Sequence, residues 1–290
     1  MDDSRHEPGP GKVHPKLRAF VTEVLGRAAK LAHRPTLEGI ENLPDGPFLL
    51  VANHGAGIAI SELTCFSALY LEQVGHEKKL AGFAHPIAFM FPGFRDVMRN
   101  LGAVPSTYES GYETLASGVP MLVFPGGDHE TLRPVWEHDL VDFGGRKGFL
   151  RMARKANVPI VPMGIRGSHL TVPILLRSRH VLPKLLVLPR LVGLKRFALT
   201  ALGVAGAAAI LTRPWRPWVK GVATWAWLTS PFVFLPVVPA TIRFRIGEPI
   251  SPEELFGEER EAEEATDGVL ERALARVQGA VQGLVTGLGE

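Results

Sequence analysis

An asparagine, a histidine and a later glutamate form the first group of side chains in this sequence that is suited to chemistry. Asn53 and His54 follow the apolar run 48–52, and Glu62 lies eight residues beyond the histidine. Histidine transfers protons near neutral pH, but as a base it needs a partner, usually a carboxylate, that fixes its tautomer. We therefore expect either a catalytic base with Glu62 as its partner, or a loop histidine that has none.

A second loop combines paired glycines with ionisable side chains. Residues 122–134 (LVFPGGDHETLRP) contain Gly126, Gly127, Glu130 and Arg133. Glycines let a ligand approach the backbone closely. Both loops follow apolar runs of strand length, and the sites of α/β domains form at the carboxyl ends of strands. We therefore expect both loops to contribute to one site.

Neither metal binding nor disulfide chemistry is expected. Asp128, His129, Glu130 and His138 are of types that bind metals, but the sequence has no helix-spaced histidine pair or cysteine ligand beside them. The single cysteine, Cys65, excludes an intrachain disulfide and fits a reducing compartment. We expect it to pack in the core.

The apolar runs predict an α/β domain over residues 35–290, with a mostly parallel sheet flanked by helices. Strand-length and helix-length runs alternate along the chain, which is typical of a parallel sheet. Residues 36–54 are expected to form a strand, a turn and a second strand at 48–52, and further strands are expected at 79–84, 101–104, 119–124, 158–164 and 241–247. Helices are expected at 61–74, 86–99, 108–117, 145–156 and 263–286.

The N-terminal residues divide into two parts. Residues 1–14 are polar and rich in proline and glycine, and they lack the apolar core of a signal peptide, so we expect a disordered leader. Residues 15–34 place apolar side chains at helical spacing opposite a largely basic face, which predicts an amphipathic helix. Packing on the domain core and lying on a membrane surface both fit that helix.

Charge is distributed very unevenly along the chain. Residues 143–247 contain 17 lysines and arginines and no acid, whereas residues 248–290 contain 11 acids and 3 bases. The basic stretch also holds four of the five tryptophans. Tryptophan beside arginine and lysine at the end of an apolar run is typical of a membrane interface. We therefore expect the protein to bind the anionic lipid leaflet on the cytoplasmic face of a membrane, and not nucleic acid.

Two apolar segments interrupt the α/β pattern within residues 195–235 and just beyond. Residues 197–211 are uncharged but short, and residues 221–241 are uncharged but contain three prolines. A bilayer-spanning helix needs about 20 apolar residues. We expect a membrane-associating insertion that forms a re-entrant or surface-lying hairpin, with a pair of buried core helices as the alternative.

The order of these motifs resembles that of the glycerolipid, or lysophospholipid, acyltransferases. The matching pieces are VANHGAGIAISE, LGAVPSTYES, VFPGGDHETLRP, the VPIVP at 158–162, and IRFRIGEPI. The proline-glycine-glycine motif is similar to that of the monoacylglycerol acyltransferase branch. The resemblance covers about residues 35–180 and 236–255, and leaves 195–235 as an insertion.

The resemblance implies a mechanism and a set of site residues. It makes His54 the general base on an acceptor hydroxyl, with Glu62 as its partner, and an acyl thioester of coenzyme A or acyl carrier protein as the donor. No bound cofactor is implied. The residues expected to bind substrate are Asn53, Gly126, Gly127, Glu130, Arg133, Arg146 and Lys147. The glycines would supply backbone N–H groups to the oxyanion. Arg133, or Arg146 and Lys147, would hold a phosphate of the acceptor or the cofactor, although Arg146 and Lys147 also fit a solvated face.

One position departs from the commonest motif of that family. The motif has an aspartate five residues after the histidine, where this chain has Ala59. In the proline-glycine-glycine branch the acid comes later, where Glu62 stands. Ala59 keeps open a second hypothesis, that of a catalytically inactive lipid-binding or membrane-scaffold protein of the same fold. Transfer to an acceptor that is not a glycerolipid is a third.

Overall fold

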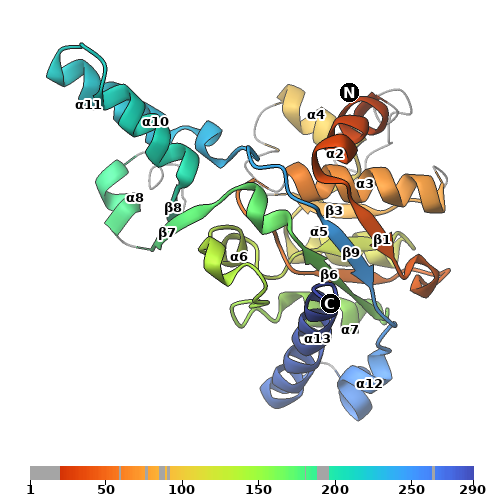
Figure 1. Cartoon of the computed structure of the whole chain (residues 1–290). Coiled ribbons are helices and arrows are strands. Elements are labelled where there is room, and N and C mark those ends of the chain that lie inside the picture. Colours follow the sequence, from red (N-terminus) through yellow and green to blue (C-terminus); the bar gives the residue numbers. More distant parts are fainter. Residues whose placement is uncertain are drawn as a thin grey trace, which may run out of the picture.

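The central feature of the fold is a mostly parallel sheet with helices on both faces (Figure 1). The computed structural model describes residues 20–290 except 59, 76–77, 85–88, 90–91, 180, 188–195 and 263–264. In this part of the chain, seven strands lie in the order β1-β9-β6-β2-β5-β3-β4. The five strands from β6 to β4 are mutually parallel, while β9 runs antiparallel to β6 and parallel to β1. The predicted α/β class is confirmed.

The strands are short and lie within or beside the predicted runs. Their bounds are β1 Thr36–Glu38, β2 Leu49–Ala52, β3 Ala81–Ala84, β4 Ala103–Pro105, β5 Met121–Val123, β6 Ile160–Arg166 and β9 Arg243–Ile246. Strand β2 has all four of its residues buried because both faces of the sheet are covered. Leu49 and Val51 pack in the cluster on one face, whereas Leu50 and Ala52 pack in the cluster on the other.

The helices fall into two layers around this sheet. Helices α2 (Gly26–His33) and α3 (Ile60–Val74) pack against each other, and Ala29 and Phe66 belong to the cluster that contains Leu50. The other layer holds α5 (Tyr108–Ala116), α7 (Gly148–Ala156) and α13 (Asp267–Gly287). Short elements complete the body: η2 Val21–Leu25, η3 Ile40–Asn42, α4 Pro92–Asn100, α6 Asp128–Thr131, η5 Val135–Glu137, η6 Ser168–Thr171, α12 Pro252–Phe256 and η8 Gly257–Arg260.

The segment between β6 and β9 forms a separate projection. It contains the two-stranded antiparallel sheet β7–β8 (Ile174–Ser178 and Phe197–Thr200), helix α8 (Val181–Leu186) and the helices α10 (Ala201–Leu211) and α11 (Pro217–Thr229). Helices α10 and α11 extend away from the body as a hairpin (Figure 1). The turn η7 (Pro231–Phe234) leads back from it. Within the described residues, no helix has both the length and the apolar character needed to cross a membrane.

Several sequence-based boundaries need correction. The alternative of two buried core helices is wrong, because Gly203 is the one buried residue of the described hairpin helices. The ribbon β7–β8 was not expected, and 197–200 belongs to it rather than to a helix. The C-terminal helix begins at Asp267, where Thr266 caps it, rather than at 263. The leader 1–14 and the first residues of the helix 15–34 lie outside the described residues, as does Ala59.

Candidate active site

The structure brings His54 and Glu62 together at the carboxyl end of β2. Glu62 lies in the first turn of α3, and its Oε1 pairs with His54 Nδ1. Its other oxygen, Oε2, accepts a hydrogen bond from the Gly55 N–H at 2.6 Å. The Glu62 side chain is 1% exposed, while that of His54 is 14% exposed. Because a carboxylate accepts, Nδ1 carries the proton and Nε2 is left as the basic atom of the ring.

The loop reaches this geometry because it contains glycines. A Cβ atom on Gly55 would lie 2.3 Å from Glu62 Oε2 and 2.4 Å from Ser168 Oγ. Gly57 has a φ of +74°, a backbone conformation that disfavours any side chain, and a Cβ there would lie 2.6 Å from the carbonyl oxygen of Phe234. The chain can therefore fold back so that a carboxylate eight residues on meets the histidine.

Asn53 fixes where the loop begins. Its Nδ2 donates to the carbonyl of Ile165 at 2.8 Å, and its Oδ1 accepts from the Ile165 N–H at 2.8 Å. The residue is 3% exposed. Both polar atoms of the amide are thus used to tie the end of β2 to β6. We correct the expected substrate-binding role of Asn53 to a framework role.

The proline-glycine-glycine loop forms the second side of the site. The ring of Phe124 stacks on the imidazole of His54, with centroids 4.2 Å apart and planes 18° apart. Glu130, in α6, accepts hydrogen bonds from the backbone N–H groups of His54 at 3.0 Å and Asp142 at 3.2 Å. A Cβ on Gly126 would lie 2.2 Å from Glu130 Oε2. The two predicted loops therefore meet, and Glu130 joins them.

Glu130 and Arg133 form a buried pair beneath the loops. Burial raises the pKa of Glu130 to about 7, although the guanidinium of Arg133, 3.7 Å away, opposes this shift. Arg133 is 2% exposed, and burial lowers its pKa. These side chains are closed off from a substrate, so their expected binding roles are corrected to holding the loops. The pair resists disruption because an isolated buried charge is very unfavourable.

The remaining predicted cations also have partners within the protein. Arg146 donates to the carbonyls of Pro125 at 3.1 Å and Gly126 at 2.8 Å, and pairs with Asp128. Arg146 therefore supports the proline-glycine-glycine loop. Lys147 points instead to α13, where its Nζ lies 3.2 Å from Glu271.

The expected roles of these two cations and of one glycine change accordingly. Arg146 supports the loop, and Lys147 joins two helices away from the site. The Gly127 N–H donates to the Phe124 carbonyl at 3.1 Å, so it is not available to an oxyanion. Gly127 is required for a different reason, since a Cβ there would lie 2.7 Å from Arg146 Nη1 and its φ is +45.

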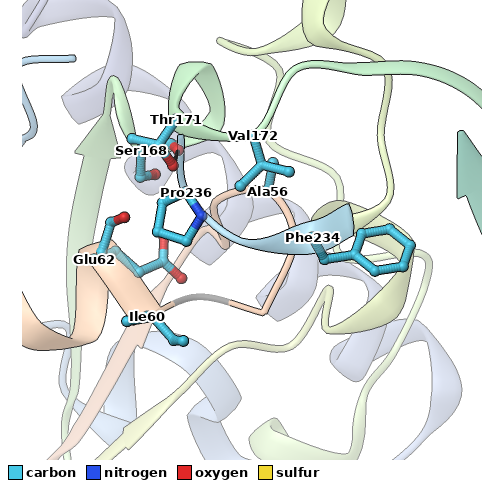
Figure 2. A pocket seen from close by; sticks show the side chains of 9 residues that line it. Ala56, Ile60, Glu62, Ser168, Thr171, Val172, Phe234 and Pro236 are labelled. Carbon is cyan, nitrogen blue, oxygen red and sulfur yellow. Dashed lines mark hydrogen bonds between the residues drawn. The ribbon is translucent and has the colours of Figure 1, made fainter. Parts of the chain in front are cut away.

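A narrow hollow lies beside the Glu62 carboxylate (Figure 2). Its lining comes from three separate segments: Ala56, Ile60, Ser61 and Glu62; then Ser168, Thr171 and Val172; then Phe234 and Pro236. The Ser61 Oγ is buried and has no hydrogen-bond partner among the described residues. The lining of the hollow combines apolar side chains with hydroxyl groups beside the Glu62 carboxylate.

Sequence reasoning missed several of these neighbours. Phe124 lies within the motif VFPGGDHETLRP, directly after β5, and this place was a usable signal for proximity to His54. Nothing in the sequence pointed to Phe234 or Ser168, which are 180 and 114 residues from His54. Among the described residues, no group of three or more ligand-type side chains is placed to hold a metal ion. His129 instead pairs with Asp142 at 2.6 Å.

Comparison with known proteins relates this region to a family. Residues 34–166 match the family model described as Acyltransferase. The matched segment contains His54, Glu62 and the whole of the proline-glycine-glycine loop. Most residues of the candidate site therefore lie in the part of the chain that matches this model; the exceptions are Ser168, Thr171, Val172, Phe234 and Pro236.

Two relatives and one solved structure are similar to this chain. An uncharacterized protein of Mycobacterium tuberculosis is 30% identical over 202 residues, which are 68% of this chain and 54% of that protein. A Mus musculus protein named DGAT1/2-independent enzyme synthesizing storage lipids is 33% identical over 135 residues, which are 47% of this chain and 40% of that protein. The chain thus spans about half the length of the curated relatives it matches. The crystal structure of the 1-acyl-sn-glycerophosphate (LPA) acyltransferase PlsC from Thermotoga maritima covers 93% of this chain and 82% of its own, with a TM-score of 0.48 and 20% identity.

Proposed function

We propose that this protein is an acyltransferase that moves a fatty acyl chain from an acyl thioester to a hydroxyl group of a lysophospholipid or another glycerolipid. The observation that carries the proposal is the His54–Glu62 pair, in which one carboxylate orients both the imidazole and the loop that holds it. The match of residues 34–166 to the Acyltransferase model supports the reaction class. The name of the Mus musculus relative supports a lipid product.

In the proposed reaction His54 acts as general base. Its Nε2 takes the proton of the acceptor hydroxyl, and the resulting alkoxide oxygen attacks the thioester carbonyl carbon. Glu62 stabilises the imidazolium that forms. The tetrahedral intermediate collapses as the carbon–sulfur bond breaks, and the imidazolium returns the proton to the leaving thiolate. The products are an ester and a free thiol, and no covalent acyl-enzyme is required.

The donor is proposed to be acyl-CoA or an acyl group on acyl carrier protein, with no bound cofactor. Cys65 is not proposed as a nucleophile. Its thiol is buried, and burial together with the nearby Glu62 carboxylate raises its pKa to about 12. A thiol in that state has very little thiolate at neutral pH. This leaves direct transfer through His54 as the simpler chemistry.

Release of free thiol from an acyl thioester tests the proposal. The full chain is incubated with acyl-CoA or acyl carrier protein and with lysophosphatidate, other lysophospholipids or monoacylglycerol as acceptor. We expect turnover with at least one acceptor, and a fall in kcat of about 10²–10⁴-fold for His54→Ala. Glu62→Gln should lower kcat as well, because one amide cannot accept both hydrogen bonds that Glu62 accepts.

His138→Ala is the matched control, since this histidine is partly exposed and lies outside the candidate site. Its kcat should stay within about twofold of the wild type. Thiol release that needs no lipid acceptor, or that His54→Ala leaves intact, would rule out the proposed mechanism. The absence of thiol release with every acceptor would favour the inactive lipid-binding scaffold instead, and turnover only with other lipids would identify an acceptor that is not a glycerolipid.

A further inference from the structure

The hairpin α10–α11 (residues 201–229) leaves apolar helix surface uncovered. Helix α10 has no charged residue on any face, yet Gly203 is its one buried residue, and α11 has none. A helix that is apolar all round normally lies inside a protein or a membrane. Five large apolar side chains of the hairpin are between 43% and 67% exposed: Val204 and Leu211 on α10, and Trp218, Val222 and Trp225 on α11. These five residues are called the hairpin stripe below.

The hairpin is nevertheless a firmly packed unit. The Trp227 Nε1–H donates to the carbonyl of Gly203 at 3.0 Å. A Cβ on Gly206 would lie 2.2 Å from the same indole nitrogen, so α10 approaches the indole ring as closely as glycine allows. Trp225 donates to the carbonyl of Leu186 at 2.8 Å and so ties α11 to α8. The hairpin stripe is therefore presented on a fixed support rather than by a loose loop.

The turn of the hairpin is positively charged. Arg213 and Arg216 are exposed, and among the described residues neither guanidinium has an ion pair or a hydrogen bond. Lys220 adds a third cation there and donates to the carbonyl of Leu211 at 2.8 Å. No acid occurs from residue 143 to 247. A second copy of the hairpin would bring like charges together, whereas lipid phosphates would neutralise them.

We propose that the hairpin α10–α11 lies in the interface of an anionic lipid leaflet. The two helices have 11 and 13 residues, which gives lengths of about 16 and 20 Å, less than the ~30 Å of a hydrocarbon core. Cations at the turn oppose deep insertion. The hairpin therefore lies along the surface, with the hairpin stripe among the acyl chains, and Arg213 and Arg216 on the phosphates.

This docking brings the candidate site to the lipid surface. The Thr200 Oγ1 at the base of α10 donates to the carbonyl of Val233 at 2.7 Å, and the next residue, Phe234, lines the hollow beside Glu62 (Figure 2). Val233 and Phe234 pack with Ala56 of the histidine loop. If the proposed function holds, an acceptor lipid would reach His54 from the leaflet along Val233 and Phe234, and this part of the inference rests on that function. The docking itself does not depend on the function.

Vesicle binding of the full chain, measured by flotation without any acyl donor, tests the docking. Wild type is compared on phosphatidylcholine vesicles with and without phosphatidylglycerol, and we expect much tighter binding to the anionic ones. Loss of two cations in Arg213→Gln/Arg216→Gln should weaken anionic binding about thirtyfold. Trp218→Ser/Val222→Ser should weaken binding to both kinds of vesicle by about tenfold or more.

Matched controls are available outside the hairpin. Trp136→Ser removes a tryptophan that is 66% exposed, and Lys79→Gln/Arg272→Gln removes two exposed cations, so both should bind as wild type does. Hairpin variants that bind vesicles like the wild type would refute the proposal. The proposal would also be refuted if the protein bound no vesicles and light scattering showed a dimer that Trp218→Ser/Val222→Ser converts to a monomer. Because no turnover is measured, an inactive protein can still pass this test.

Discussion

At the scale of single residues, two buried titratable groups near the site oppose each other. Burial raises the pKa of Glu130 to about 7 and lowers that of His169 to about 4. Folded protein therefore retains a proton on Glu130 between about pH 4.5 and 7, and excludes one from His169 between about pH 4 and 6.5. Glu130 makes stability fall as the pH rises through its window, whereas His169 makes stability fall as the pH drops through its own.

Replacing His169 should reveal the contribution of Glu130 to the pH dependence of stability. In wild type, His169 donates from Nε2 to the carbonyl of Arg133 at 2.8 Å, and an asparagine retains an N–H donor. When the pH is lowered from 7.5 to 5, the unfolding free energy of wild type carries a loss of about 2 kcal/mol from His169, and the His169→Asn variant should lack that loss. Urea unfolding at several pH values measures this. His138→Asn should follow wild type, and parallel curves for wild type and His169→Asn would contradict the prediction.

At the scale of elements, the hairpin contains two glycines with opposite surroundings. A Cβ on Gly206 of α10 would lie 2.2 Å from Trp227 Nε1, whereas a Cβ on Gly221 of α11 would meet nothing within 4 Å. Both glycines are inside helices, where glycine is intrinsically less favourable than alanine. Packing between the helices should therefore decide the sign of each substitution.

The two alanine variants should separate these effects. Gly206→Ala should push α10 away from Trp227 and destabilise the hairpin by about 1–3 kcal/mol. Gly221→Ala should stabilise α11 by about 0.5–1 kcal/mol. Hydrogen exchange of the backbone amides in residues 201–229 reports both changes locally. Equal protection in the two variants would mean that the close approach at Gly206 does not support the hairpin.

The elements that could be predicted from the sequence are those whose structure is determined by residues close together in the chain. The apolar run of β2 and the helix that contains Ser61 follow from residues within one short window. The partners of Lys147 and Glu130 could not be predicted because they lie far along the chain. Lys147 pairs with Glu271, 124 residues away, and Glu130 with the His54 N–H, 76 residues away. Residue spacing carries no information on such contacts.

At the scale of the whole molecule, the C-terminal helix supports the site from the opposite layer. Helix α13 presents Gln282, whose Oε1 accepts from the Val141 N–H at 2.8 Å, and Gln278, whose Oε1 accepts from the Phe143 N–H at 3.1 Å. Between these two anchored residues, the Asp142 N–H donates to Glu130. Glu130 in turn accepts from the His54 N–H. Hydrogen bonds, joined through the backbone of residues 141–143, thus link α13 to the backbone of the proposed base.

Removing both glutamine side chains should therefore affect stability and catalysis together. Gln278→Ala/Gln282→Ala leaves two backbone N–H groups without their acceptors, which should lower the unfolding free energy by about 2–4 kcal/mol. Because Asp142 then no longer holds Glu130 firmly, kcat should fall several-fold while KM changes little. Urea unfolding and thiol release measure the two effects. Gln73→Ala, on the exposed side of α3, is the control. A fall in stability with an unchanged kcat would show that α13 supports the fold without positioning His54.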